Sequence, residues 1–226
     1  STLSSSSAAS DVYKRQTRFD PGQLAADDFQ RSGIEAPPSI QRSVAKRQAE
    51  FLAGRLCARA ALQQLQRLDW VPPIGDDRAP IWPEHICGSI THSSGRAAAI
   101  VADKQHWRGL GMDLEHLLSA ERAAKLAEQI LTPAELQRRD QLPAELHALA
   151  VTLTFSIKES LFKALYPLVH KRFYFEHAEV LEWSAEGPVR MRLLTDLSEE
   201  WQHGRELQGQ FAVQDDHLLS LVAIKA

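Results

Sequence analysis

The pattern of hydrophobic and polar positions predicts a helix followed by a hairpin in the first half of the chain. Residues 40–68 carry hydrophobic side chains at helical spacing, and only Gly54 interrupts the run, so one long helix is expected there. Residues 86–103 are typical of two strands joined by a Ser-Ser-Gly turn. Residues 110–117 continue as a strand that runs into a helix.

A second helical region is predicted from a start signal at residues 131–136. Thr132 can cap the helix, Pro133 fits its first position, and Glu135 can return a hydrogen bond. Leu131 can pack against Leu136 as a hydrophobic staple. One helix should follow this signal, and another should contain the sequence FSIKES at residues 155–160.

The C-terminal third is β-prone in three segments that should close a sheet: residues 171–183, 188–194 and 210–224. A charged helix thus precedes hairpin-like strands in each half, which suggests a duplicated α+β unit without a fixed period. A chain of 226 residues with 44% hydrophobic residues has room for one large domain or two small ones, each with its own core.

Composition narrows the class of protein. The formal net charge is −3, which gives no global attraction to nucleic acid or to an anionic membrane, so neither is expected as a partner. No window is apolar for long enough to span a bilayer. Cys57 and Cys87 show neither disulfide nor metal-ligand spacing, which favours a reducing, cytoplasmic location.

The first sixteen residues are serine-rich and differ in composition from the rest. They lack the basic start and apolar core of a secretory signal. We expect residues 1–16 to be non-native or disordered, with structure beginning near Thr17.

The helix at residues 154–164 places Ser156, Glu159, Ser160 and Lys163 on one polar arc. A surface ion pair of Glu159 with Lys163, contributing about 0.2 to 0.5 kcal/mol, would account for this arc. Lys158 falls within the apolar arc, which the surface ion pair does not explain, although a lysine stem can run along the surface and keep its charge in water.

The sequence GMDLE suggests a second interpretation of Glu159. In a strand, Asp113 and Glu115 point to one face about 6 to 7 Å apart, where their charges repel unless water or a cation separates them. Solvated carboxylates are the plain alternative. Together with Glu159 they make three oxygen ligands, a set that suits Mg²⁺ and a phosphate-bearing substrate.

Donors for phosphate groups occur in two regions of the first half. The sequence SITHSS supplies hydroxyls and an imidazole, although a polar hairpin turn would look the same: Ser89, Thr91, His92 and Ser93. The long helix between Ser39 and Arg67 holds six basic residues and one acidic residue, Glu50. Such runs are commonly solvated faces, but four cations are candidates for nucleotide phosphates: Lys46, Arg47, Arg55 and Arg78.

These motifs, in this order, resemble the Sfp-type phosphopantetheinyl transferases: RAPIWP, GSITHS, GMDLE and FSIKESLFKA. The segments KRQAEFLAGRLCAR and KRFYFEHAEVLEW resemble the subgroup of enterobactin synthetase component D, and most closely its broad-range pseudomonad members. The resemblance extends from Thr17 to the C-terminus. This chain has Phe155 where many members have Trp, and Thr91 where many have Ser.

The resemblance implies an α+β fold of two pseudo-twofold-related α/β lobes, with the active site in the cleft between them. Residues 17–104 would form an N-terminal lobe on the nucleotide side of coenzyme A. Residues 105–226 would form a C-terminal lobe with the metal and catalytic motifs. The resemblance also implies a monomer.

Site residues follow from the resemblance, position by position. The family pattern G-x-D-x-E matches Gly111, Asp113 and Glu115, and its aromatic-S-x-K-E-x-x-x-K matches Phe155, Ser156, Lys158, Glu159 and Lys163. The implied ligands of Mg²⁺, or of Mn²⁺ in its place, are Asp113, Glu115 and Glu159. The implied catalytic residues are Glu159, Lys163 and His92. The implied coenzyme A contacts are Lys46, Arg47, Arg55, Arg78, Thr91, His92 and Lys163.

The implied reaction moves the phosphopantetheine arm of coenzyme A onto a serine of apo acyl or peptidyl carrier proteins and releases adenosine 3',5'-bisphosphate. Glu159, directly or through a metal-bound water, would accept the serine proton. Carriers of this kind tend to be acidic, so a basic and apolar docking surface is expected beside the site. Two alternatives stay open from the residues: a Mg²⁺-dependent phosphohydrolase, and a coenzyme-A-binding module without turnover.

Overall fold

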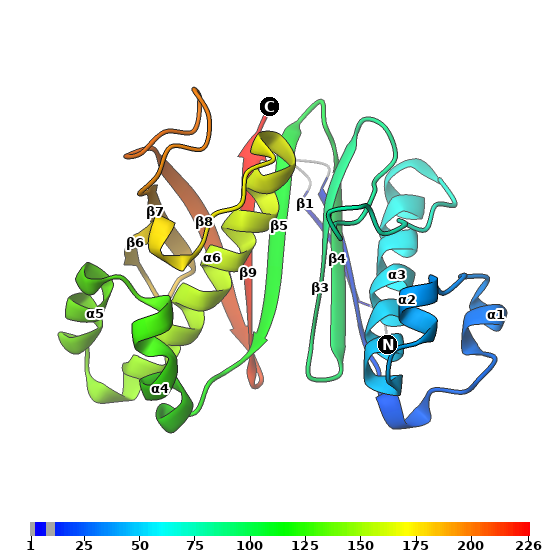
Figure 1. The fold of residues 1–226 in the computed structure, drawn as a ribbon, viewed down its shortest axis with the longest axis horizontal. Coiled ribbons are helices and arrows are strands. Elements are labelled where there is room, and N and C mark those ends of the chain that lie inside the picture. Colours follow the sequence, from blue (N-terminus) through cyan, green and yellow to red (C-terminus); the bar gives the residue numbers. More distant parts are fainter. Residues whose placement is uncertain (1–2, 8–11) are drawn as a thin grey trace. The chain divides into compact units, whose positions relative to one another are not determined.

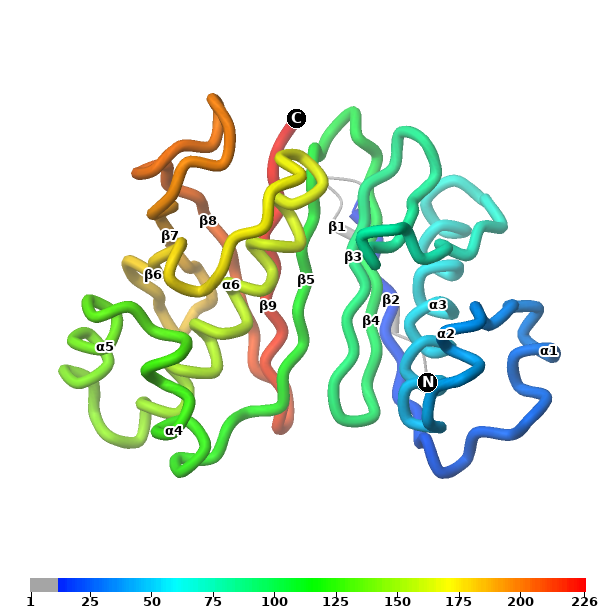
Figure 2. The backbone as a smooth tube through the Cα atoms, viewed as in Figure 1, coloured from blue at the N-terminus to red at the C-terminus, as the bar shows by residue number. Residues whose placement is uncertain are grey.

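The computed structural model describes residues 3–7 and 12–226, and its helices and strands are shown in Figure 1 and its chain path in Figure 2. The chain divides into two compact units, Ser1–Leu110 with Lys225–Ala226, and Gly111–Ile224. The sequence placed the division between residues 104 and 105. In the structure the division falls between Leu110 and Gly111, inside strand β5 (Trp107–His116). The residues of β5 up to Leu110 belong to the first unit, and those from Gly111 belong to the second.

The first unit contains an antiparallel sheet with the strand order β1-β2-β4-β3. Its strands are β1 (Leu3–Ser7), β2 (Val12–Arg18), β3 (Ile86–Ser93) and β4 (Arg96–Asp103). The hairpin of β3 and β4, predicted with a Ser-Ser-Gly turn, is confirmed. Ser94 and Gly95 both have positive φ in that turn.

Strand β2 begins at Val12, five residues before the expected start at Thr17, and pairs with β4 from Val12 to Arg18. Long-range contacts explain the earlier start: Tyr13 packs against a core cluster, and the Arg15 Nε donates to Gln64 Oε1 at 3.0 Å. The expectation of disorder is therefore wrong for residues 12–16, and for residues 3–7, which form β1 and pair with β2. Residues 1–2 and 8–11 lie outside the described residues, so the expectation stays a prediction there.

The predicted long helix is α3 (Ala45–Gln66), and it packs against β2, β3 and β4. The sequence predicted its start at Ile40, but Ile40 and Gln41 belong to the separate short helix α2 (Pro38–Gln41). The short elements η1 (Pro21–Gln23) and α1 (Asp28–Ser32) precede it. Gly54 lies at a close contact, since a Cβ there would lie 2.8 Å from the Ile90 Cγ2.

The second unit contains a sheet with the strand order β5-β9-β8-β7-β6. Its other strands are β6 (Ala178–Trp183), β7 (Pro188–Leu193), β8 (Glu206–Gln214) and β9 (His217–Lys225). The three β-prone segments all contribute, with two corrections. Residues 171–177 are no strand and end in the short helix η3 (Phe175–His177). The third segment folds into a hairpin at Asp215, whose φ of 56 lies in the left-handed region.

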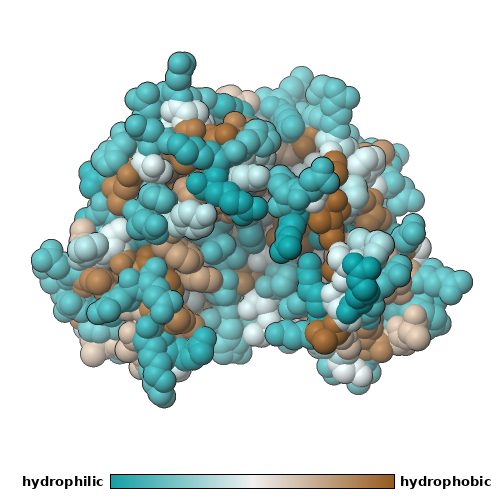
Figure 3. Space-filling model, viewed as in Figure 1, coloured by the Kyte–Doolittle hydropathy of each residue, from teal (hydrophilic) through white to brown (hydrophobic). Residues whose placement is uncertain are grey.

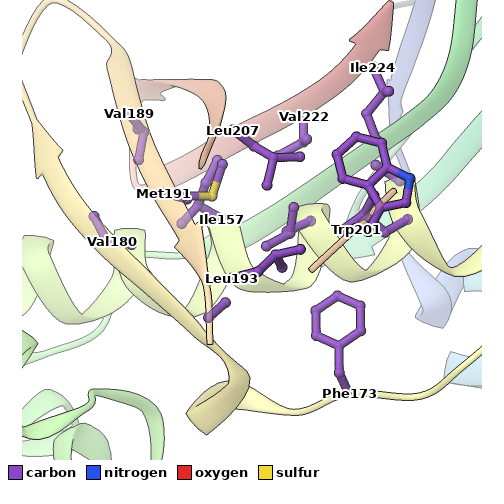
Figure 4. Close-up of a cluster of buried hydrophobic side chains, with 14 of the residues drawn as sticks. Ile157, Phe173, Val180, Val189, Met191, Leu193, Trp201, Leu207, Val222 and Ile224 are labelled. Atoms are coloured by element: carbon purple, nitrogen blue, oxygen red, sulfur yellow. The ribbon is translucent and has the colours of Figure 1, made fainter. Parts of the chain in front are cut away.

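Helix α6 (His147–Val169) supplies the centre of the second core. Figure 4 shows Ile157 of this helix close to side chains of the strands, including Met191 and Val222. Many of its positions are buried, as is typical of a helix at the centre of a domain rather than at its surface. The preceding helices are α4 (Ala120–Ile130), α5 (Pro133–Asp140) and η2 (Ala144–Leu146).

The predicted start of α5 is confirmed as a capping box. The Thr132 N–H donates to Glu135 Oε1 at 2.7 Å, and the Glu135 N–H donates to Thr132 Oγ1 at 3.3 Å. Leu131 and Leu136 pack in the same apolar cluster, as a staple requires. The local signals in the sequence were therefore enough to place this helix.

Lys158 corrects the expectation that its stem carries the charge to water. Its side chain is only 3% exposed, and its Nζ lies 2.7 Å from Glu135 Oε1. The same ammonium group donates to the carbonyls of Ile130 and Phe175, both at 2.9 Å. The buried charge is thus paired and hydrogen-bonded, the condition under which such a pair is tolerated in a core.

Figure 3 shows hydrophilic side chains over much of the visible face, interspersed with smaller apolar areas. Among the described residues, the large hydrophobic side chains with high exposure are Val44, Ile81, Tyr174 and Val213. No helix in the described part of the chain is both long enough and apolar enough to cross a membrane.

Candidate active site

Three acidic side chains of the second unit come from one strand and one helix. Asp113 and Glu115 lie on β5, and Glu159 lies on α6. Gly111 permits the contact between these elements, because a Cβ at that position would lie 1.8 Å from the Ser160 carbonyl oxygen. The close packing of α6 on β5 brings Glu159 into electrostatic range of Asp113.

Asp113 is the most deeply placed of the three carboxylates, with 5% of its surface exposed. Its Oδ1 lies 3.4 Å from the Lys163 Nζ, which also donates to the Met112 carbonyl at 2.9 Å. Its Oδ2 is buried and has no hydrogen-bond partner among the described residues. Lys163 therefore connects α6 to β5. Its contacts extend beyond the ion pair with Glu159 that the sequence suggested.

Burial and mutual repulsion raise the pKa of two of these carboxyl groups. The pKa of Glu115 is raised to about 8, first by burial and then by the Asp113 carboxylate, with a further contribution from Glu159. Burial and then Asp113 also raise the pKa of Glu159, whereas Lys163 opposes both shifts. Without a cation other than Lys163, the cluster therefore holds protons at a pH where isolated carboxyls are charged.

The pKa of Glu115 predicts how stability depends on pH in the absence of metal. Between its ordinary value of 4.5 and its folded value of about 8, the folded protein keeps a proton that the unfolded chain has released. The free energy of unfolding therefore falls as pH rises through this window, by at most about 1.4 kcal/mol per pH unit and by less for a partly exposed group.

Denaturant unfolding in EDTA at about pH 6 and about pH 8 measures this slope. The Glu115→Gln variant should lose most of it. Glu121→Gln, at an exposed position of α4, should keep it. An unchanged slope in Glu115→Gln would contradict the assignment of the raised pKa to this group.

The chemistry of the cluster suits a hard cation. Within residues 3–7 and 12–226, no group of three or more His, Cys, Asp or Glu side chains is already drawn together as metal ligands. The cluster nevertheless offers carboxylate oxygens only, one of which is buried and without a partner. Oxygen ligands of this kind are preferred by Mg²⁺ and Mn²⁺.

In the first unit, the structure joins His92 of β3 to α3. The His92 Nδ1 lies 3.2 Å from Glu50 Oε2, and the imidazole is partly exposed. Thr91, the next residue back along the strand, is only 3% exposed because alternate positions of β3 face the interior. Of this predicted pair, His92 is thus the one that a ligand in solvent can reach.

The four predicted nucleotide cations differ in their surroundings. Lys46 is exposed and Arg47 half-buried in the first turn of α3, while Arg78 occupies a loop turn with a φ of 70. Arg55 is buried: its Nε donates to the Pro72 carbonyl at 3.0 Å, and its guanidinium lies 4.3 Å from the Phe51 ring centroid. Burial, with Arg47 adding repulsion, lowers the pKa of Arg55 to about 10. Arg55 therefore has a structural role that needs no ligand.

Two groups near the site residues were not predicted from the sequence. Glu50 was counted only as a charge, yet it contacts His92. At the end of β5, His116 Nε2 lies 2.9 Å from Asp216 Oδ2, and His217 Nδ1 lies 2.8 Å from Asp216 Oδ1. Asp215 and Asp216 between two β-prone segments are typical of a turn. Nothing in the local sequence indicates that this turn contacts the end of β5.

Comparisons with known proteins identify the family. Residues 35–102 match the family model described as 4'-phosphopantetheinyl transferase N-terminal domain, and residues 109–222 match the 4'-phosphopantetheinyl transferase superfamily. The chain belongs to the 4'-phosphopantetheinyl transferase superfamily. The resemblance inferred from the motifs is thereby confirmed.

Named relatives agree with this assignment. Enterobactin synthase component D of Escherichia coli O157:H7 is 33% identical over 184 residues, which cover 81% of this chain and 84% of the relative. The 4'-phosphopantetheinyl transferase Npt of Nocardia iowensis is 38% identical over 62% of each chain. The 4'-phosphopantetheinyl transferase PptT of Mycobacterium tuberculosis is 38% identical over 65% of this chain and 63% of the relative.

The predicted α+β class, transferase activity and enzymatic nature are confirmed by this assignment. A phosphopantetheinyl transferase uses coenzyme A as a substrate and acts on carrier proteins. The family assignment thus favours group transfer over the phosphohydrolase and the binding module that the residues alone left open.

Proposed function

We propose that this transferase depends on Mg²⁺, or on Mn²⁺ in its place, and that Asp113, Glu115 and Glu159 hold the cation. The observation that carries the proposal is the partnerless buried Oδ2 of Asp113 beside two carboxyl groups with raised pKa. Either protonation or a cation relieves this repulsion, and a bound cation would do so with all three carboxylates ionised. When bound, the metal would supply charge neutralisation for the pyrophosphate of coenzyme A.

The residues of the chain divide the remaining work. Lys163 places a positive charge beside Asp113 and would stabilise negative charge that develops on the phosphate oxygens. Glu159, a partly buried carboxylate of the same cluster, would accept the proton of the attacking serine. His92, oriented through Nδ1 by Glu50, would contact a phosphate of coenzyme A.

The proposed bond changes balance as a phosphoryl-type transfer. The serine oxygen of an apo carrier forms a bond to the β-phosphorus of coenzyme A, and the bond from that phosphorus to the bridging oxygen breaks. Adenosine 3',5'-bisphosphate leaves with the bridging oxygen, and Glu159 takes the serine proton. Positioning and electrostatics supply most of the catalysis in reactions of this kind.

We assign the nucleotide side of coenzyme A to the first unit and the metal and transfer chemistry to the second. The exposed Lys46 and Arg78, with Arg47, support the first assignment. Thr91 and Arg55 are buried, so their proposed part is to support the elements that carry the other contacts. We further propose a monomer, as the resemblance implies, and a cytoplasmic location, which the free thiols of Cys57 and Cys87 support. We also propose apo acyl and peptidyl carrier proteins as substrates, and the relative named enterobactin synthase component D supports a substrate that belongs to a biosynthetic synthase.

Replacement of Lys163 by alanine tests the transition-state role. We expect kcat/KM for carrier modification to fall by about 10² or more, mainly through kcat, because the cation acts where charge develops. Lys125→Ala, at an exposed position of α4, should leave kcat/KM unchanged. A Lys163→Ala protein with wild-type kcat/KM would remove this lysine from the mechanism.

A carrier-free reaction separates transfer from hydrolysis. Wild-type protein, coenzyme A and Mg²⁺ are incubated with and without an apo carrier, and adenosine 3',5'-bisphosphate is quantified. Release that requires the carrier, with one bisphosphate formed for each carrier modified, is the expected result. Equal release without a carrier would contradict transfer as the reaction.

A further inference from the structure

Three serine side chains form a closed hydrogen-bonded cluster inside the second unit. Ser156 and Ser160 lie on α6 and Ser220 lies on β9, and all three are 0% exposed. The Ser220 Oγ lies 2.7 Å from the Oγ of Ser156 and 2.7 Å from the Oγ of Ser160. The Ser160 Oγ also donates to the Ser220 carbonyl at 3.1 Å.

The cluster also extends to the strand that carries two of the proposed metal ligands. The Ser156 Oγ donates to the Asp113 carbonyl at 3.4 Å. Three hydroxyls have only three protons for these four contacts, so one contact lacks a proton at any moment, and the long Ser156 contact is the weakest. Ser220 thus connects α6 to β9 directly, and Ser156 connects α6 to β5.

The serine cluster fixes the position of α6 relative to the neighbouring strands. Ser156 and Ser160 are one turn apart and share the polar arc of Glu159. Because the single hydroxyl of Ser220 contacts both, it fixes the rotation of the helix and its position along its own axis. At Gly111, where α6 touches the β5 backbone, there is no room for even one methyl group, so the helix is held against the two neighbouring strands β5 and β9.

Apolar side chains would fill the same space without this constraint. Apolar contacts are non-directional, whereas a buried hydroxyl network is satisfied in only one arrangement of its donors and acceptors. A shift of α6 by a fraction of a turn would break several of these bonds together. The network therefore specifies one position of Glu159 relative to the Asp113 backbone.

We infer that Ser156, Ser160 and Ser220 are positioning residues that hold Glu159 against Asp113 and Glu115 and so set the affinity for the divalent cation. This inference rests on the proposed function of those three carboxylates. The serines themselves touch neither cation nor substrate. Outer-shell partners of metal ligands typically contribute a factor of about 10 to 100 in metal affinity.

The test uses Ser220→Ala, which deletes the hydroxyl at the centre of the cluster but leaves Ser160 its carbonyl acceptor and Ser156 the Asp113 carbonyl. Mn²⁺ is titrated into wild-type and variant protein in the presence of coenzyme A, and free Mn²⁺ is measured by electron paramagnetic resonance. The variant should bind Mn²⁺ about tenfold more weakly. Its Mg²⁺ requirement for half-maximal transfer should rise similarly, while kcat at saturating Mg²⁺ stays within about twofold of wild type.

The matched control is Ser119→Ala, which removes the exposed N-cap of α4 in the same unit, where the Ser119 Oγ accepts from the Arg122 N–H, and lowers stability without removing a contact of α6. It should bind Mn²⁺ as wild type does. Ser156→Ala is a second variant, and it should also bind Mn²⁺ more weakly than wild type. It provides the test if Ser220→Ala does not fold.

The outcomes distinguish a failure of the positioning role from a failure of the proposed metal site. If wild-type protein binds Mn²⁺ and the serine variants bind it equally well, the positioning role is overturned and the proposed metal site is not. A wild-type protein that binds no Mn²⁺ with coenzyme A present would overturn the proposed metal site and this inference with it.

Discussion

Replacing Asp113 by alanine is expected to abolish phosphopantetheine transfer while leaving the chain folded. The change deletes both the carboxyl oxygen that contacts Lys163 and the one that has no partner. It also removes the repulsion that raises the pKa of Glu115 and Glu159, so it should not lower stability as the loss of a satisfied buried group would. We expect kcat/KM to fall by about 10³ or more, the scale of losing a group that organises charge in the transition state.

Two measurements on one preparation check this prediction. Mass spectrometry follows modification of an apo carrier, and thermal unfolding compares stability with wild type. Asp140→Ala, at a largely exposed position at the end of α5, is the control and should remain active. A folded and fully active Asp113→Ala protein would remove this residue from the site.

Replacing Gly111 by alanine is expected to have the largest effect on stability. The added Cβ would lie 1.8 Å from the Ser160 carbonyl oxygen and 2.7 Å from the Ala164 nitrogen, both of them backbone atoms. Because backbone cannot rotate away, α6 must move off β5, which disturbs both the core around Ile157 and the position of Glu159. Overpacking of this kind costs about 3 kcal/mol or more.

The measurement is the free energy of unfolding from denaturant titration, with transfer activity as a second observable. Gly22→Ala is the matched control, because its Cβ would meet only the Asp20 carboxyl group, at 3.3 Å. It should be close to wild type in both respects. A Gly111→Ala protein with wild-type stability would show that the contact between α6 and β5 is looser than the structure indicates.

Much of the fold was predictable because its signals are local. Thr132 and Glu135 lie three residues apart and form the capping box that their spacing indicates. The Ser94–Gly95 turn likewise joins the two strands expected on either side of it. The carboxylates of the candidate site were predictable for another reason, since like charges on one face of an apolar segment require an explanation.

The errors concern partners far away in the sequence. Lys158 was expected to reach water, but Glu135, 23 positions earlier, holds it in the core. Asp216 lies 100 positions from His116, and nothing in either segment indicates that they meet. Arg55 looked like any basic residue of an exposed helix face until its contacts with Pro72 and Phe51 were known. Hydrophobic patterning gives the side of a helix that is buried, but it does not give the partner of a buried charge.

Intact mass spectrometry of an apo carrier protein tests the central claim most directly. The carrier is incubated with this transferase, coenzyme A and Mg²⁺, and a parallel reaction contains EDTA. The account predicts that the carrier gains the mass of one phosphopantetheine arm with Mg²⁺ and gains none with EDTA. A gain that persists in EDTA would contradict the metal role of Asp113, Glu115 and Glu159, and no gain on any acyl or peptidyl carrier would contradict the proposed reaction of this chain.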